Sequence, residues 1–302
     1  MDDFNYYPIV IPTLNRYEHF KKCVESLARN THADKTELIV GLDYPPSDKY
    51  MEGYLKIKKY IPTIRGFNKV TVIEHQHNLG ASKNIVFLRD YAFKKYDACI
   101  STEDDNEFAP CALDYFNKAL SFYKDNSKVV SVSAYNFPCL NSSIKYSTFF
   151  FHGYSAWGVG RWKSKNNKID SDFATKVLQR PRFVLKLLKT DSRVLFKLLN
   201  MIALSRTYGD LQYDVFNILF DKLVLYPKLS LSRNHGHDGS GINCQAIANS
   251  LYENQEISSD DIFLLEKIPV VDTYSRELRK YFKMPFRECL GAVFRFLKFK
   301  FL

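Results

Sequence analysis

The chain has 302 residues, enough for one large domain or two small ones, and 46% of them are apolar. This composition supplies a substantial core and excludes disorder of the whole chain. The net charge of +10 favours an anionic partner such as a nucleic acid, a membrane surface or a phosphorylated ligand.

The positive charge is concentrated in two segments. Residues 176–206 carry +7 and residues 276–302 carry +6, so the remainder of the chain carries −3. The body of the protein is therefore slightly acidic, and the basic character belongs to these two stretches.

The sequence shows neither the pattern of a targeting signal nor a closely spaced pair of cysteines. The N-terminus is acidic, with no charged-then-apolar signal peptide, and no stretch has the roughly 18–20 apolar residues of a membrane span. The six cysteines are scattered and form no CxxC pair, which disfavours a zinc site or a disulfide framework. We therefore expect a protein that stays in the cytoplasm.

Strands and helices alternate over the first 135 residues. Apolar runs bounded by prolines or charges predict strands, and apolar residues at helical spacing predict helices. The strands are predicted at 7–12, 37–42, 69–74, 98–102 and 129–134, and the helices at 17–27, 48–61, 80–95 and 112–123. This alternation predicts an α/β fold, with a mostly parallel sheet and helices on both faces.

The second half of the chain has a different character. Residues 136–172 are rich in aromatic residues, glycine, serine and asparagine, which favours a structured loop region over a site. A helix with one basic face is predicted at 182–204, a shorter helix at 210–222, and a strand at 223–226. A polar glycine loop follows at 234–241, and 276–302 has the pattern of an amphipathic helix.

Acidic residues follow several of the predicted strands, namely Asp43, Glu74 and the run 103–105. In open parallel sheets, ligands bind at the carboxyl ends of the strands. Adjacent carboxylates repel one another unless a cation compensates them, and Mg²⁺ or Mn²⁺ prefers oxygen ligands. The pattern favours a metal–diphosphate site; the alternative is an acidic N-terminus of the next helix, capped by Asp105 or Asn106.

Seven segments lie in a specific order and spacing over about residues 7–245. They are 8–16 (PIVIPTLNR), 38–43 (LIVGLD), 77–84 (HNLGASKN), 102–110 (TEDDNEFAP), 157–160 (WGVG), 213–215 (YDV) and 237–241 (HDGSG). Together they resemble the motifs of family 2 glycosyltransferases of bacterial surface-polysaccharide type, which have the GT-A (nucleotide-diphospho-sugar transferase) fold. The acidic segment is similar to that of N-acetylglucosaminyltransferase I-like enzymes.

The resemblance implies a nucleotide-sugar donor, with UDP as the favoured nucleotide. It implies that Asp43 contacts the base, and that Asp105 holds Mn²⁺ or Mg²⁺ at the diphosphate. The other positions implied to surround the donor are Thr13, Arg16, Lys83, Asn84, Glu103, Asp104, Trp157 and His237. Trp157 would stack on a sugar ring or pack beneath its loop, and either His237 or His235 is a candidate third metal ligand.

The resemblance also implies an inverting reaction, in which a carboxylate removes the proton of the acceptor hydroxyl. Asp214 matches the position of that base, and Asp210, one helical turn earlier, is the alternative. The competing interpretation of Asp214 is a carboxylate placed near a helix N-terminus by the helix dipole. Tyr213 departs from the family, where tryptophan is frequent, which concerns the acceptor pocket more than the chemistry.

We expect a catalytic domain at 1–245, with a nucleotide-binding half at 1–135 and an acceptor half at 136–245 that contains a basic helical insertion at 176–206. Residues 246–302 would form a helical, basic segment on an anionic membrane. The alternatives are packing of its apolar face on the domain or on a second subunit in a homodimer. The expected acceptor is a lipid-linked oligosaccharide or a saccharide, at the inner face of the plasma membrane.

Other functions fit the sequence less well. A nucleic-acid-binding protein fits the charge alone, but the sequence has no nucleic-acid motif, so we expect no nucleic-acid partner. A sugar-nucleotide nucleotidyltransferase would need a glycine-rich basic loop after the first strand, where this chain has 12–16 (PTLNR). An inactive protein of the same fold is disfavoured because Asp105 and Asp214 are both present.

Overall fold

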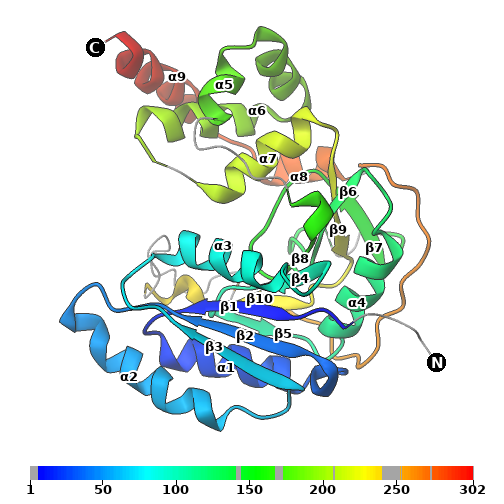
Figure 1. The fold of residues 1–302 in the computed structure, drawn as a ribbon. Helices are drawn as coiled ribbons and strands as arrows, with labels where there is room; N and C mark the ends of the chain where they lie inside the picture. Colours follow the sequence, from blue (N-terminus) through cyan, green and yellow to red (C-terminus); the bar gives the residue numbers. More distant parts are fainter. Residues whose placement is uncertain are drawn as a thin grey trace.

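A mixed sheet forms the body of the protein, and a separate group of helices lies beyond one end of it (Figure 1). The computed structural model describes residues 6–140, 144–166, 173–206, 208–239, 252, 254–272 and 274–301. Within these ranges, no helix has both the length and the apolar character that crossing a membrane requires.

The first half of the chain has the predicted alternation of strands and helices. Its elements are β1 (Ile9–Thr13), α1 (Tyr17–Ala28), β2 (Glu37–Leu42), α2 (Met51–Tyr60), β3 (Lys69–Glu74), α3 (Ala81–Ala92), β4 (Ala98–Ser101), β5 (Asn106–Phe108), α4 (Ala112–Phe122) and β6 (Val129–Ser133). Only the short β5, directly after the acidic run, was not predicted. The expectation of an α/β fold is confirmed over this half.

The second half contains strands that the sequence pattern did not predict. Its elements are β7 (Thr148–Phe151), β8 (Val159–Trp162), α5 (Phe173–Leu178), α6 (Pro181–Ala203), α7 (Gly209–Leu219), β9 (Leu223–Pro227), β10 (Ser232–Asn234), α8 (Ser275–Tyr281) and α9 (Phe286–Phe301). The expectation of loop over 136–172 is therefore wrong for β7 and β8. Both strands are buried at every position, so neither shows the alternation of a half-buried strand.

The main sheet has eight strands in the order β3-β2-β1-β4-β8-β6-β9-β7. The first four are parallel, β8 and β7 run antiparallel to their neighbours, and β6 and β9 are parallel to each other. A second, two-stranded sheet pairs β5 with β10 in antiparallel register. This pairing brings the chain after residue 231 back to the acidic run.

Both faces of the parallel half are covered by helices, with α1 and α2 on one face and α3 on the other (Figure 1). Side chains of β1 alternate between the two resulting cores. Ile9 and Ile11 belong to the cluster that includes α1, α2 and α4, whereas Val10 packs with Leu88 of α3. Burial on both faces explains why the strand sequence is apolar throughout.

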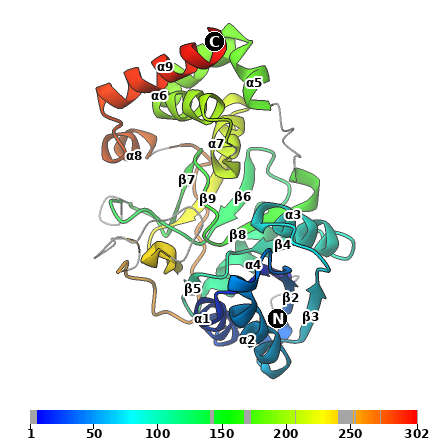
Figure 2. The same cartoon turned by 90° about the vertical axis from the view of Figure 1, so that its left-hand side faces the viewer.

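Helices α5, α6 and α7 have a hydrophobic cluster of their own, which includes Leu187, Leu198 and Val215. Helix α9 lies along α6 in both views (Figures 1 and 2). Helix α6 is kinked at Asp191, whose buried carboxylate accepts hydrogen bonds from Arg193 and lies 3.7 Å from the ring of His152. The helical group is thus a second packed unit, placed against the antiparallel end of the sheet.

Residues 254–272 contain neither helix nor strand, but they pack against the main core. Partly buried Ile257, Phe263 and Leu265 contact the same cluster as α1 and α4. Lys118 of α4 donates a hydrogen bond to the carbonyl of Phe263. The chain that leads to α8 and α9 therefore runs over the body of the protein before it reaches the helical group.

Candidate active site

The acidic run follows β4 and is held against the loop after β1. Arg16 donates hydrogen bonds to both Asp104 and Asp105, at 2.7 Å to Asp105 Oδ2, and the Thr13 hydroxyl donates to Asp104 Oδ2 at 2.9 Å. Strands β1 and β4 are parallel neighbours, so their carboxyl ends meet at one edge of the sheet. The structure thus brings together four of the predicted donor-site residues: Thr13, Arg16, Asp104 and Asp105.

Negative charge at this edge exceeds the positive charge that the protein supplies. Glu103 is exposed at this edge, and the protein atoms packed around it, followed by repulsion from Asp105 and then from Asp210, shift its pKa upward. Desolvation also raises the pKa of Asp104, although Arg16 opposes this. Among the described residues, Arg16 forms salt bridges with Asp104 and Asp105. One cation thus faces two carboxylates, with a third, Glu103, next in the chain, which leaves the site suited to a further cation.

Asp105 is fixed by the two-stranded sheet. Asn234 of β10 donates from Nδ2 to Asp105 Oδ1 at 2.9 Å, and the backbone N–H of His235 donates to the Asp105 carbonyl at 2.8 Å. Gly236 passes so close that a Cβ atom there would lie 2.3 Å from Asp105 Oδ2. The carboxylate therefore has a defined position, set by residues 129 or more positions later in the chain.

The two histidines of the glycine loop, His235 and His237, have different surroundings. The ring of His235 is hydrogen-bonded to Glu107 Oε2 at 2.7 Å, and this bond, together with Arg233, holds the pKa of Glu107 well below its usual range. His237 is buried, and its Nδ1 has no hydrogen-bond partner within the described part of the chain. Residues 240–250, including the end of the predicted glycine loop, lie outside the described residues.

Trp157 and His237, both predicted to surround the donor, lie in one aromatic cluster. Their ring centroids are 5.8 Å apart, and each also contacts Tyr252, which stacks on His237 at 5.0 Å. Tyr135 meets Trp157 edge-on at 4.7 Å. The Trp157 side chain is half-buried, so it packs in this cluster and still keeps part of its surface exposed.

Asp43, the predicted base contact, organises the loop before α3. Its carboxylate accepts the backbone N–H groups of Leu79 and Gly80 at 2.8 Å each, and that of Tyr44 at 3.0 Å. Gly80 has φ of +77°, in the left-handed region that glycine adopts at little cost. Asp43 therefore fixes the loop that begins α3, and its contact with a base stays a prediction.

Asn84 and Lys83, on the first turn of α3, differ in burial. Asn84 is buried, donating from Nδ2 to the carbonyl of Gly41 at 2.9 Å, and its Oδ1 is bonded to the ring of His75 at 3.0 Å. Lys83 is exposed. Of the two, Lys83 is the side chain that a ligand can reach, whereas Asn84 joins α3 to β2.

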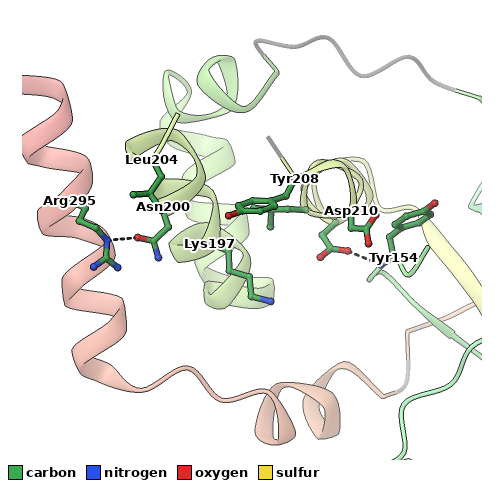
Figure 3. Close-up of a pocket in the computed structure, with 9 residues that line it drawn as sticks. Tyr154, Lys197, Asn200, Leu204, Tyr208, Asp210 and Arg295 are labelled. Atoms are coloured by element: carbon green, nitrogen blue, oxygen red, sulfur yellow. Dashed lines mark hydrogen bonds between the residues drawn. The ribbon is translucent and has the colours of Figure 1, made fainter. Parts of the chain in front are cut away.

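Asp210 and Asp214 of α7 line a cavity of about 540 Å³ between the sheet and the helical group (Figure 3). Exclusion of water raises the pKa of Asp214 to about 7, against the effect of the Tyr154 N–H, which donates to Oδ1 at 2.7 Å. Asp210 is exposed, and the protein atoms packed around it also shift its pKa upward, opposed by Arg161. A carboxylate with the pKa of Asp214 can accept a proton near neutral pH.

Repulsion between Asp210 and Glu103 connects this cavity with the acidic run, because it contributes to the raised pKa of Glu103. The two carboxylates come from α7 and from the end of β4. The predicted base and its alternative therefore stand in a cavity that adjoins the predicted donor site.

Several site residues were not predicted from the sequence. Buried Arg161 of β8 lies 3.9 Å from the ring centre of Tyr213 and 4.8 Å from that of Tyr154, and so supports one wall of the cavity. Asn234 positions Asp105, and Arg295 lines the cavity from α9. An arginine inside a predicted buried strand would have indicated Arg161 as a candidate, but the sequence pattern did not predict strand β8. No local pattern indicates Asn234 or Arg295.

Residues 9–184 match the family model described as glycosyl transferase family 2. The match spans more than half of the chain and includes β1, the acidic run and β8. The chain belongs to glycosyl transferase family 2. It is a glycosyltransferase with a GT-A fold, as the resemblance implied. Membership of this family disfavours the two alternatives, a nucleotidyltransferase and a nucleic-acid-binding protein.

The solved structures that match this family 2 chain do so at low identity and with low TM-scores. TarS from S. aureus has 18% identity and a TM-score of 0.30, over 43% of this chain and 21% of TarS, so the match spans about a fifth of that protein. The mannosyltransferase PcManGT from Pyrobaculum calidifontis, solved with GDP-Man and Mn²⁺, has 12% identity over 71% and 68% of the two chains, with a TM-score of 0.38. Mouse xyloside xylosyltransferase 1 has 12% identity over 72% and 83%, with a TM-score of 0.39. No curated protein matches the chain.

Proposed function

We propose that this glycosyltransferase takes its sugar from a nucleoside-diphosphate donor, specifically a UDP-sugar. The observation that carries the proposal is the fixed arrangement of Thr13, Arg16, Asp104 and Asp105 at the carboxyl ends of β1 and β4. Ligands of open parallel sheets bind at this edge. The donor sugar would lie toward Glu103 and the cluster that contains Trp157.

The residues at this edge fit a divalent cation, Mn²⁺ or Mg²⁺. They offer carboxylate oxygens, and desolvation together with repulsion from Asp105 raises the pKa of Glu103 and of Asp104 against the opposing effect of Arg16. Asp105 would hold the ion; in the described residues no three acidic, histidine or cysteine side chains converge on one point, so other ligands would come from the diphosphate and water. Such an ion stabilises the charge of a departing diphosphate.

We propose an inverting displacement in the cavity beside the donor. The acceptor hydroxyl loses its proton to a carboxylate of α7, its oxygen forms the bond to the anomeric carbon, and the bond from that carbon to the diphosphate oxygen breaks. Asp214 is the proposed base, because its pKa of about 7 suits proton transfer near neutral pH. Asp210 is the alternative, since it is the α7 carboxylate whose charge contributes to the raised pKa of Glu103.

The acceptor and the location are part of the same proposal. An exposed apolar face on α9, with Phe286 and Phe294 exposed by 75% and 68%, stands among the basic residues of 276–302. A helix of this kind binds the interface of an anionic membrane. We propose a peripheral protein at the inner face of a bacterial plasma membrane, which extends a lipid-linked saccharide in surface-polysaccharide synthesis.

A thermal-shift screen of nucleoside diphosphates and nucleotide sugars, with and without Mn²⁺, tests the donor proposal. We expect UDP and a UDP-sugar to raise the melting temperature only when Mn²⁺ is present. The Asp105→Ala variant should lose this metal-dependent shift. If nucleotide with Mn²⁺ raised the melting temperature of this variant as much as that of the wild type, the proposed metal site would be refuted. If no nucleotide or nucleotide sugar shifted the melting temperature of the wild type, the proposed donor class would be refuted.

A further inference from the structure

The cavity beside α7 has charges of opposite sign on opposite sides. Asp210 stands with Tyr154 on one side, and Lys197 of α6 and Arg295 of α9 on the other (Figure 3). Asp214 accepts the hydrogen bond of the Tyr154 N–H and so belongs to the acidic side. A neutral sugar would need only hydrogen-bonding groups here. The two cations therefore call for a separate explanation.

The charge of Lys197 acts to lower the pKa of Asp214, but among the described residues no carboxylate pairs directly with either cation. Within the described ranges, neither Lys197 nor Arg295 forms a salt bridge, and no hydrogen bond from Lys197 Nζ is found. Arg295 is oriented by Asn200, whose Oδ1 accepts a hydrogen bond from its Nε at 2.9 Å. This bond leaves the terminal amino groups of the guanidinium for a ligand, in the forked geometry that suits phosphate.

The surroundings of Arg295 also suit a fixed orientation. Its guanidinium lies over Gly291 of the same helix, where a Cβ atom would be 3.2 Å from Nη1. A guanidinium held by Asn200 on one side and lying on Gly291 on the other is a preorganised anion contact.

We propose that the cavity binds a phosphorylated acceptor, with its phosphate ester at Lys197 and Arg295 and its reacting hydroxyl at Asp214 or Asp210. This inference rests on the proposed glycosyl transfer and names the chemical class of the acceptor. The volume of about 540 Å³ has room for a sugar together with its phosphate. The same phosphate chemistry could belong to a membrane phospholipid headgroup, so the test includes both sources.

Calorimetry with glucose 1-phosphate as the probe and glucose as the matched neutral sugar tests this inference. The protein is first saturated with UDP and Mn²⁺, so that the diphosphate site is occupied. We expect glucose 1-phosphate to bind and glucose to bind at least about tenfold more weakly, because each contact to a charged group contributes about a factor of ten. Lys197→Ala and Arg295→Ala should each lower the affinity for glucose 1-phosphate by about tenfold. Lys197→Arg, which keeps the positive charge, should retain most of the affinity.

Lys189→Ala is the matched control, because Lys189 is exposed on the same helix and does not line the cavity. Equal affinity of wild type, Lys197→Ala and Arg295→Ala for glucose 1-phosphate would overturn the inference. So would a loss of binding to phosphatidylglycerol vesicles in these variants without any binding of glucose 1-phosphate, which would assign the cations to lipid headgroups. Binding of UDP, measured on the same samples, reports on the proposed function separately.

Discussion

At the scale of single residues, the acidic run depends on partners from two other parts of the chain. Thr13 and Arg16 come from the end of β1, and Asn234 comes from β10. Together they hold Asp104 and Asp105 in fixed positions before any ligand binds. A preorganised set of this kind avoids the cost of reorganisation during the reaction.

Replacement of Gly236 by alanine should displace the Asp105 carboxylate. The new Cβ atom would lie 2.3 Å from Asp105 Oδ2, so the carboxylate has to move away from Arg16. We expect about tenfold weaker binding of UDP in the presence of Mn²⁺, measured by calorimetry. Gly209→Ala is the control, since nothing lies within 4 Å of its added Cβ. Unchanged affinity in Gly236→Ala would show that the Asp105 position is not needed for binding.

The raised pKa of Asp214 predicts the pH dependence of transfer. The carboxylate accepts a proton only when ionised, so kcat should fall about tenfold per pH unit below pH 7 and level off above it. Asp214→Asn keeps the Oδ1 that accepts the Tyr154 N–H, but should lower kcat by about 10²–10⁴-fold, with UDP binding unchanged. The assay is release of UDP from the donor identified in the screen.

The exposed carboxylate of Asp221 provides the matched control, as Asp221→Asn should leave both the rate and the pH profile unchanged. If Asp214→Asn turned over normally while Asp210→Asn did not, the role of base would pass to Asp210.

At the scale of elements, α9 presents different faces to the protein and to solvent. Ala292 is buried where the helix packs along α6, and Arg295 reaches the cavity. Phe286, Leu290 and Phe294, at spacings of four residues, remain exposed. The sequence left membrane binding and packing on the domain as alternatives for this helix; the structure shows packing on the domain together with an unburied apolar face.

A double substitution, Phe286→Ser with Phe294→Ser, should release the protein from anionic vesicles. Both side chains are more than two-thirds exposed, so folding should be unaffected while apolar area for membrane insertion is lost. We expect co-sedimentation with phosphatidylglycerol vesicles to fall by about tenfold or more. Phe122→Ser, at a 55% exposed position on α4, should behave as the wild type. Full retention of the double variant on vesicles would remove α9 as the anchor.

At the scale of the whole molecule, the proposed donor and acceptor sites stand on different hydrophobic cores. The proposed donor residues lie beside the clusters around the parallel sheet, whereas Lys197, proposed to bind the acceptor, belongs to a helix with its own cluster. The cavity lies where the two units meet, between α6, α7, α9 and the loop that holds Tyr154. Acceptor binding should therefore be more sensitive than donor binding to the packing of the helical group.

Leu198→Ala tests this separation. Leu198 is fully buried in the cluster of α5–α7, and its truncation should cost about 2–5 kcal/mol of local stability. We expect weaker glucose 1-phosphate binding and an earlier denaturant transition, with an unchanged UDP affinity. Leu185→Ala, at a 51% exposed position of the same helix, should change neither. Parallel loss of UDP binding in Leu198→Ala would show that the two units fold and bind as one.

The sequence alone determined the alternation of strands and helices in the first half and the place of the acidic run after β4. Both depend on local patterns: strands buried on both faces are continuously apolar, and ligand-binding residues follow their carboxyl ends. Tertiary structure decided the rest. The pairing of β5 with β10 brings Asn234 and Gly236 to Asp105, and the packing of α9 on α6 brings Arg295 to the cavity of Asp210. These contacts join positions far apart in the chain, and their register is set by how the elements pack, which no local sequence pattern specifies.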